Sequence, residues 1–162
     1  MGLKEAFLNK GWAGRTISRE ETIERLNPLI RRLYELLYAY LSAERSLQDR
    51  DVAAAFEQPL KFLRADIGKL SETVFSCGGI AYNGTDLEVS DFDLGDSDDA
   101  ILFHLLDREE AVAGALDAEK EIEHQIRTRA LLDVIRSNSR NRLELLRRLT
   151  AARRRPIPSR AS

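Results

Sequence analysis

One stretch, residues 56–79, constrains the fold more than any other part of the chain. Seven apolar residues in it recur at alternating steps of four and three, which places them on one side of a helix. They are Phe56, Leu60, Leu63, Ile67, Leu70, Val74 and Cys77. Gly78 and Gly79 then end the helix, because glycine adopts the left-handed C-cap conformation without a Cβ penalty. Such a stripe needs other helices to cover it, so the sequence predicts a helical bundle.

The length and composition fit a single soluble domain. The chain has 162 residues, of which 43% are apolar, enough to build one core. Its single cysteine allows no internal disulfide, which is consistent with a reducing compartment. The start lacks the apolar run of a signal peptide, and no stretch approaches the roughly 20 apolar residues of a membrane span. We therefore expect a cytoplasmic protein without membrane contact.

The apolar spacing and the helix-ending residues divide the chain into three parts. We expect an N-terminal extension at 1–17 with Trp12 as a packed anchor, a bundle at 18–155 and a disordered basic tail at 156–162. The bundle helices are expected at about 18–48, 51–77, 98–125 and 129–154, with a crossover at 78–97. Ser18 and Glu21 form a capping-box pattern at the first start. Pro28 and Pro59 each leave two alternatives, a continuous kinked helix or a separate first piece.

The lengths of two segments predict how the helices are connected. About 20 extended residues at 78–97 reach roughly 60 Å, more than the roughly 40 Å of a 28-residue helix. The crossover can therefore return along the bundle and leave its two flanking helices parallel. The run 100–155 is too long for one helix in a domain of this size, so it must fold back. Its apolar spacing is least regular at 125–129, and the alternative turn is 137–139.

Four helices with one long crossover resemble the ferritin-like fold. The residues that carry the resemblance are LNPLI at 26–30, LSETVFSCGG at 70–79, and AVAGALDAEKEIEH with RALLDVIRSNSRNRLELLRRL in the C-terminal half. The likeness covers roughly 20–152 and is greatest to the uncharacterised bacterial ferritin-like families rather than to bacterioferritin. It implies an all-α, ferritin-like four-helix bundle with one long crossover.

The resemblance also implies positions for a di-iron site, which needs inward carboxylates and Glu-x-x-His pairs. These positions fall near Leu33, Leu63, Asp66, Leu106, Ser139 and Arg142. One carboxylate survives among them, so the implied site is degenerate and no catalytic residue or cofactor is expected. Leu33, Leu63 and Leu106 should instead form a dry apolar layer. Asp66 should turn to the edge of the bundle and meet an arginine of the last helix.

Other side chains offer metal ligands in principle. The candidates for iron or manganese are Glu44, Asp66, Glu119, Glu121 and His124. Glu121 and His124 have the i, i+3 spacing of two ligands on one helix face. That face lies away from the apolar seam, so we expect both side chains to point to water. The acidic run 91–98 could ligate calcium, but it lacks the residue order and the closing glutamate of an EF-hand loop.

Charge is distributed unevenly along the chain, although the net charge is only -2. Residues 83–123 hold 14 acidic and 2 basic side chains, whereas 124–162 hold 2 acidic and 11 arginine side chains. We interpret this as pairing between the last two helices. The alternative is that the C-terminal arginines contact the phosphates of a nucleic acid. Cys77 has no neighbouring base in the sequence, so we interpret it as a small core residue.

Two functions from different classes remain. The first is a non-catalytic ferritin-like bundle that serves as an assembly or interaction module. The alternative is a metal-binding ferritin-like oxidoreductase or iron-storage and stress protein with a rearranged site. A second apolar line on the first helix indicates a homodimer through that helix, because surplus apolar surface commonly marks a partner contact. Its residues are Leu29, Tyr34, Leu36, Tyr38 and Leu47.

Overall fold

The computed structural model describes residues 15–154, and every element in that range is helical. The four long helices are α2 (Arg19–Ser46), α4 (Glu57–Ser76), α5 (Asp98–Ala118) and α6 (Ile126–Arg154). Shorter pieces are α3 (Arg50–Ala54) and the 3-10 turns η2 (Val89–Asp91) and η3 (Glu119–Glu121). The prediction of an all-α bundle of four helices is confirmed. The expectations for Trp12 and for the tail 156–162 fall outside the described residues.

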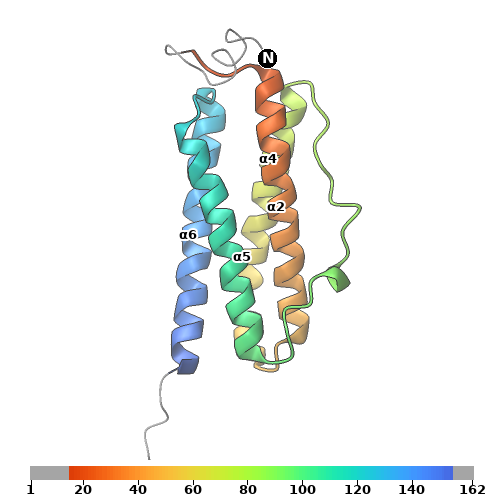
Figure 1. The fold of residues 1–162 in the computed structure, drawn as a ribbon, viewed down its shortest axis with the longest axis vertical. Coiled ribbons are helices and arrows are strands. Elements are labelled where there is room, and N and C mark those ends of the chain that lie inside the picture. The colour runs from red at the N-terminus through yellow and green to blue at the C-terminus, as the bar shows by residue number, and fades with distance from the viewer. Residues whose placement is uncertain (1–14, 155–162) are drawn as a thin grey trace, which may run out of the picture.

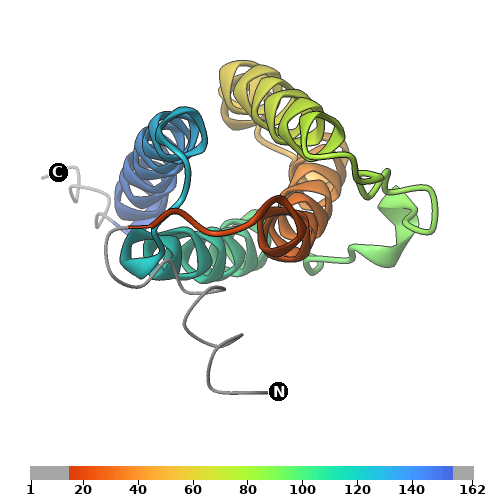
Figure 2. The same cartoon turned by 90° about the horizontal axis from the view of Figure 1, so that it is seen from above.

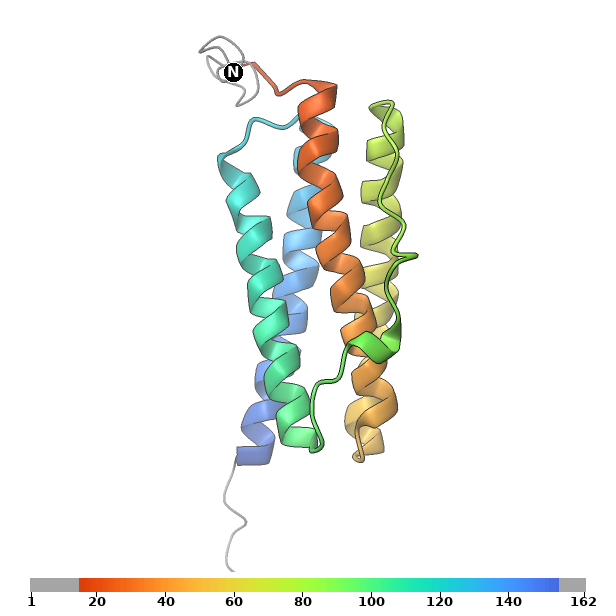
Figure 3. The same cartoon turned by 45° about the vertical axis from the view of Figure 1, so that its right-hand side comes forward.

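The chain runs along the bundle four times and crosses it once in extended form. In Figure 1, the segment 78–97 descends beside the bundle from the end of α4 to the start of α5, so these two helices run in the same direction. Figure 3 shows the same crossover lying along α2 and α4. Seen from above in Figure 2, the order around the bundle is α4, α2, α5, α6. Helix α2 packs against both α4 and α5, and α5 packs most extensively against α6.

Local sequence signals set most helix ends. The Ser18 hydroxyl accepts a hydrogen bond from the Glu21 backbone N–H at 3.1 Å and caps α2. Pro28 lies inside α2 without dividing it, and its missing N–H removes the one intrahelical bond to the carbonyl of Glu24. Pro59 lies in the first turn of α4, and α3 is the separate piece before it. Gly78 takes φ +87° after α4, as the left-handed C-cap predicts.

The turn between α5 and α6 lies earlier than expected. Helix α5 ends at Ala118, and α6 begins at Ile126 rather than at 129. The alternative turn at 137–139 is wrong, because those residues lie inside α6. The chain leaves α5 through η3, after which Ile122 is extended and the His124 side chain is buried.

The second apolar line of α2 is covered by this chain itself. Leu29, Leu36 and Leu47 are each at most 5% exposed. The crossover covers the two tyrosines: Tyr34 meets Tyr82 edge to face at 5.7 Å between ring centroids, and Tyr38 stacks on Phe92 at 6.1 Å. The apolar surface that indicated a homodimer through α2 is therefore covered within the chain, and it no longer supports a homodimer.

The apolar stripe defined above runs from Phe56, just before α4, to Cys77, just after it, and faces the core. Six of its seven members are buried, and the expectation that Cys77 is a core residue is wrong because Cys77 is only partly buried at the helix end. Gly79 lies so close to Ile23 of α2 that a Cβ added there would stand 2.8 Å from its side chain. Close contact thus fixes where the crossover leaves the bundle. Within 15–154, no helix combines the length and the apolar character needed to cross a membrane.

Candidate functional site

Six polar side chains meet in the middle of the bundle, and we call them the central cluster. They are Tyr40 of α2, Asp66 of α4, Glu109 of α5, and Asn138, Ser139 and Arg142 of α6. All except Asn138 are at most 2% exposed. Such a concentration of buried polar groups costs folding free energy unless they bond one another.

Glu109 of α5 is the centre of the cluster, because its partners come from two other helices, α2 and α6. Its carboxylate accepts hydrogen bonds from the Tyr40 hydroxyl at 3.0 Å and from the Ser139 hydroxyl at 3.0 Å. The Arg142 Nε donates to both carboxylate oxygens, at 2.9 and 3.1 Å. A charged acceptor with a charged donor makes the strongest class of protein hydrogen bond. The Glu109 carboxylate is thus fully bonded without water.

Arg142 and Asp66 are less completely bonded. The Asp66 Oδ1 accepts from the Asn138 amide at 2.9 Å, and its Oδ2 lies 3.8 Å from Arg142 Nη1. Within the part of the chain that the structure describes, Asp66 Oδ2 and both Nη atoms of Arg142 have no hydrogen-bond partner. The cluster therefore retains unused donors on one side of a buried guanidinium.

Burial and the neighbouring charges shift the pKa values of this cluster. Burial raises the pKa of Asp66, although the Asn138 amide and the Arg142 charge oppose it. Burial also raises the pKa of Tyr40 well above its usual value, and the Glu109 charge adds to this. For Arg142, burial acts to lower the pKa, but the carboxylate of Glu109 outweighs it and the pKa is raised. Arg142 therefore carries a buried positive charge at neutral pH.

The sequence contains a signal for this cluster that the analysis of apolar residues missed. Glu109 stands four residues after Leu105 and three before Val112, which is a seam position of α5. Ser139 and Arg142 fill the corresponding gap between Ile135 and Leu146 on α6. Polar residues at seam spacing, on helices that are otherwise apolar there, indicate an inward polar layer. Tyr40 is the member of the cluster that α2 contributes, and its side chain is fully buried.

The expected leucine layer is only partly present. Leu33 and Leu63 are fully buried, but Leu106 is only partly buried. Glu109, one turn further along α5, takes the inward position, so a dry apolar layer at this level is wrong. Asp66 does meet an arginine of the last helix, as expected. Its exposed fraction of 2% shows that it does so within the core rather than at the edge.

A second polar group closes the end of the bundle near the α5–α6 turn. The expectation that His124 points to water is wrong, because its side chain is 1% exposed. Its Nε2 lies 2.7 Å from Glu119 Oε2, and the other carboxylate oxygen lies 3.6 Å from Arg25 Nη1 of α2. Glu121 is exposed and does not join them. His124 is buried because the turn folds it back over the helix ends, and this is not visible in helical spacing.

The remaining metal candidates do not assemble either. Glu44 is partly buried near the end of α2, where it lines a surface pocket with Arg50 and Arg64. In the acidic run, Asp91 and Asp93 accept hydrogen bonds from nearby backbone N–H groups. Within residues 15–154, no three side chains of His, Cys, Asp or Glu group closely enough to hold a metal ion.

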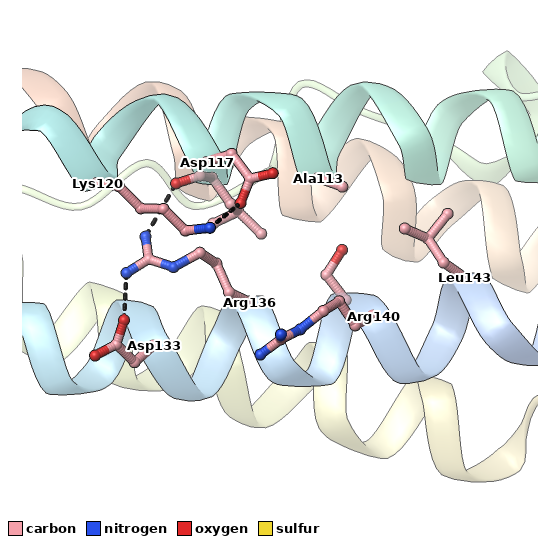
Figure 4. A pocket seen from close by; sticks show the side chains of 9 residues that line it. Ala113, Asp117, Lys120, Asp133, Arg136, Arg140 and Leu143 are labelled. Carbon is pink, nitrogen blue, oxygen red and sulfur yellow. Dashed lines mark hydrogen bonds and ion pairs between the residues drawn. The ribbon is translucent and has the colours of Figure 1, made fainter.

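A pocket of about 290 Å³ lies between α5 and α6 beside the central cluster (Figure 4). Arg136 crosses it, donating to the Leu116 carbonyl at 3.0 Å and to the Asp133 carboxylate. Lys120 pairs with Asp117 at 3.1 Å on the opposite wall. Each ion pair lies on one side of the pocket, and the hydrogen bond from Arg136 to the Leu116 carbonyl connects the two sides. We therefore interpret the pocket as a seam lined by locally neutralised charges.

The uneven charge distribution has a structural counterpart in the contacts of α5 with α6. Arg142 pairs with Glu109 in the core, and Arg153 pairs with Asp99 at the end of the bundle. Arg147 lies 3.6 Å from Glu110 on the surface between them. The interpretation of acidic and basic stretches as paired helices is confirmed for these residues. Comparison with protein-family models gave no match, and comparison with the curated proteins gave none.

Proposed function

We propose that this chain is a non-catalytic ferritin-like bundle in which the guanidinium of Arg142 occupies the core position that a metal ion takes in iron-binding relatives. The bundle order and the α4–α5 crossover are those expected of that fold. The resemblance places ligand positions at Leu63 and Asp66 on α4 and at Ser139 and Arg142 on α6. These positions meet Glu109 of α5 in the central cluster.

The contact that carries the proposal is the ion pair between Glu109 and Arg142, with Nε and Oε2 2.9 Å apart. An arginine is not deprotonated in proteins, so its charge repels a cation placed beside it. Arg142 also hydrogen-bonds both oxygens of the Glu109 carboxylate, which would otherwise be a possible iron ligand. Ser139 and Leu63 stand where a Glu-x-x-His motif would supply ligands, and neither suits iron. The proposed role is therefore interaction or binding rather than redox chemistry, and it does not need a dimer through α2.

Metal analysis of the purified chain tests this proposal. After expression in medium supplemented with iron and manganese, we expect clearly substoichiometric metal by mass spectrometry. Thermal unfolding should also be unchanged by a chelator or by added Fe(II) or Mn(II), because a ligand of the folded state would shift the midpoint. One or more ions bound per chain in the bundle centre would overturn the proposal. That result would favour the alternative, a metal-binding oxidoreductase or iron store.

A further inference from the structure

A pocket of about 280 Å³ lies between α6 and the first half of α4. These two helices form the ends of the arc of helices in Figure 2. Its apolar walls include Pro59, Phe62 and Leu145, and its polar walls include Asn138, Asn141 and Arg148. Arg142 also lines it. The pocket therefore combines an apolar surface with several hydrogen-bond donors, which is the usual composition of a small-molecule site.

Arg142 connects this pocket to the central cluster. Its Nε is committed to Glu109, whereas Nη1 and Nη2 are buried without a hydrogen-bond partner among the described residues. A guanidinium presents its N–H groups as a planar fork that matches the two oxygens of a carboxylate. Buried N–H donors are normally hydrogen-bonded, so the two Nη groups of Arg142, which have no such bond within residues 15–154, point to a ligand with acceptor oxygens.

We propose that this pocket binds a small carboxylic acid, with its carboxylate towards Arg142 and Arg148 and its apolar body against Phe62 and Leu145. The Phe62 side chain is 48% exposed, so a ligand there would cover apolar surface that now faces water. The Asn138 and Asn141 amides add neutral donors for the same oxygens.

Asp66 is the group that opposes such a ligand, since its Oδ2 lies 3.8 Å from Arg142 Nη1. Burial raises the pKa of Asp66, which lessens its repulsion of an incoming anion. The inference rests on the proposed metal-free core, because a metal ion there would compete with Arg142 for the carboxylates of Asp66 and Glu109. The two are tested separately, the core by metal content and the pocket by ligand binding.

Octanoate is a suitable probe. Two control ligands accompany it: 1-octanol, which has the apolar chain without a carboxylate, and acetate, which has the carboxylate without the long chain. Isothermal titration calorimetry on the full chain should give one octanoate site with a Kd about tenfold or more below that of 1-octanol, as expected for a hydrogen-bonded charge. Acetate should bind more weakly than octanoate, because it lacks the apolar body. In nuclear magnetic resonance spectra, the Arg142 Nη–H signals should shift as octanoate is added.

Matched variants locate the site on the surface of a folded chain. Phe62→Ala and Arg148→Glu should each weaken octanoate binding severalfold. Phe75→Ala, on the same helix and 60% exposed, and Arg147→Glu, the neighbouring exposed arginine, do not line the pocket and should leave Kd unchanged.

The proposal is overturned if octanoate does not bind, or binds no more tightly than 1-octanol. It is equally overturned if the pocket variants and their controls weaken binding alike, or if the Arg142 signals do not move at saturation. A metal-free chain that fails these tests would leave the proposed core intact and remove only the ligand site.

Discussion

Two buried acids on the same helix are bonded in contrasting ways. Asp98, the first residue of α5, accepts from the backbone N–H groups of Gln48 and Asp49 at 2.8 and 2.9 Å. Glu109, in the middle of α5, accepts only from side chains, and these come from α2 and α6. The first acid fixes one turn to one helix end. The second joins α2, α5 and α6 in the core.

The contrast predicts how each acid contributes to stability. Asp98 is 8% exposed, and the backbone N–H of Gln48 is the main reason that its pKa is lowered; burial opposes this. Its two hydrogen-bond donors are neutral backbone groups, and its only ion-pair partner among the described residues, Arg153 Nη1, lies 3.9 Å from Oδ2. Glu109 is completely buried beside the charge of Arg142. Removing one partner there leaves the other charge unpaired in the core, which costs more than the pair itself contributes.

The largest effect is expected from Arg142→Leu. It leaves the Glu109 carboxylate without its counter-charge, and we expect the free energy of unfolding to fall by about 3 to 5 kcal/mol. Chemical denaturation followed by circular dichroism measures this.

The matched control is the double variant Glu109→Gln with Arg142→Leu. The glutamine is neutral, and its oxygen can still accept from Tyr40 and Ser139, so most of the lost stability should return. A double variant as unstable as Arg142→Leu alone would attribute the loss to packing rather than to charge.

Leu63→Ala tests the apolar part of the core on α4. Leu63 is fully buried, so lost burial and a residual cavity should lower the free energy of unfolding by about 2 to 5 kcal/mol. The comparison with Arg142→Leu then separates the two kinds of core contribution. A cost below about 1 kcal/mol would mean that the core around Leu63 closes over the gap.

Sequence reasoning reached the helices and the crossover because both follow from local signals. Ser18 and Gly78 mark helix ends by their own chemistry, and the length of 78–97 sets how far it can reach. The central cluster was missed because Glu109 bonds residues 69 and 33 positions away in the chain. Its seam position was visible, but its partners depend on how three helices are rotated against one another. His124 was missed because a turn, rather than a helix face, buries it.

Asp98→Ala tests the acid that is bonded by backbone N–H groups. It leaves the two N–H donors at Gln48 and Asp49 without an acceptor, which should cost about 1 to 3 kcal/mol. The folded pKa of Asp98 lies below its unfolded value, so the stabilisation is present above about pH 3.9 and is lost as pH falls through the folded pKa. Denaturation at neutral pH and at about pH 3 should therefore show the variant and the natural chain converging in acid.

The smallest effect is expected from Asp66→Asn, which keeps an oxygen that can accept from the Asn138 amide and removes the charge. Burial raises the folded pKa of Asp66, so folding favours its neutral form. Its ionised form therefore weakens the fold progressively as pH rises from about 3.9 through the folded pKa. Asparagine is neutral at every pH, and we expect the free energy of unfolding at neutral pH to change by less than about 1 kcal/mol.

The pH dependence of Asp66→Asn sharpens the comparison further, because it removes the contribution of Asp66 and leaves that of Asp98. Relative to the natural chain, the variant should gain stability between about pH 4 and pH 7, the reverse of the sign expected for Asp98→Ala. A loss as large as that of Arg142→Leu would show that Arg142 depends on both acids. The central cluster would then be a three-charge network in which Asp66 holds the guanidinium as firmly as Glu109 does.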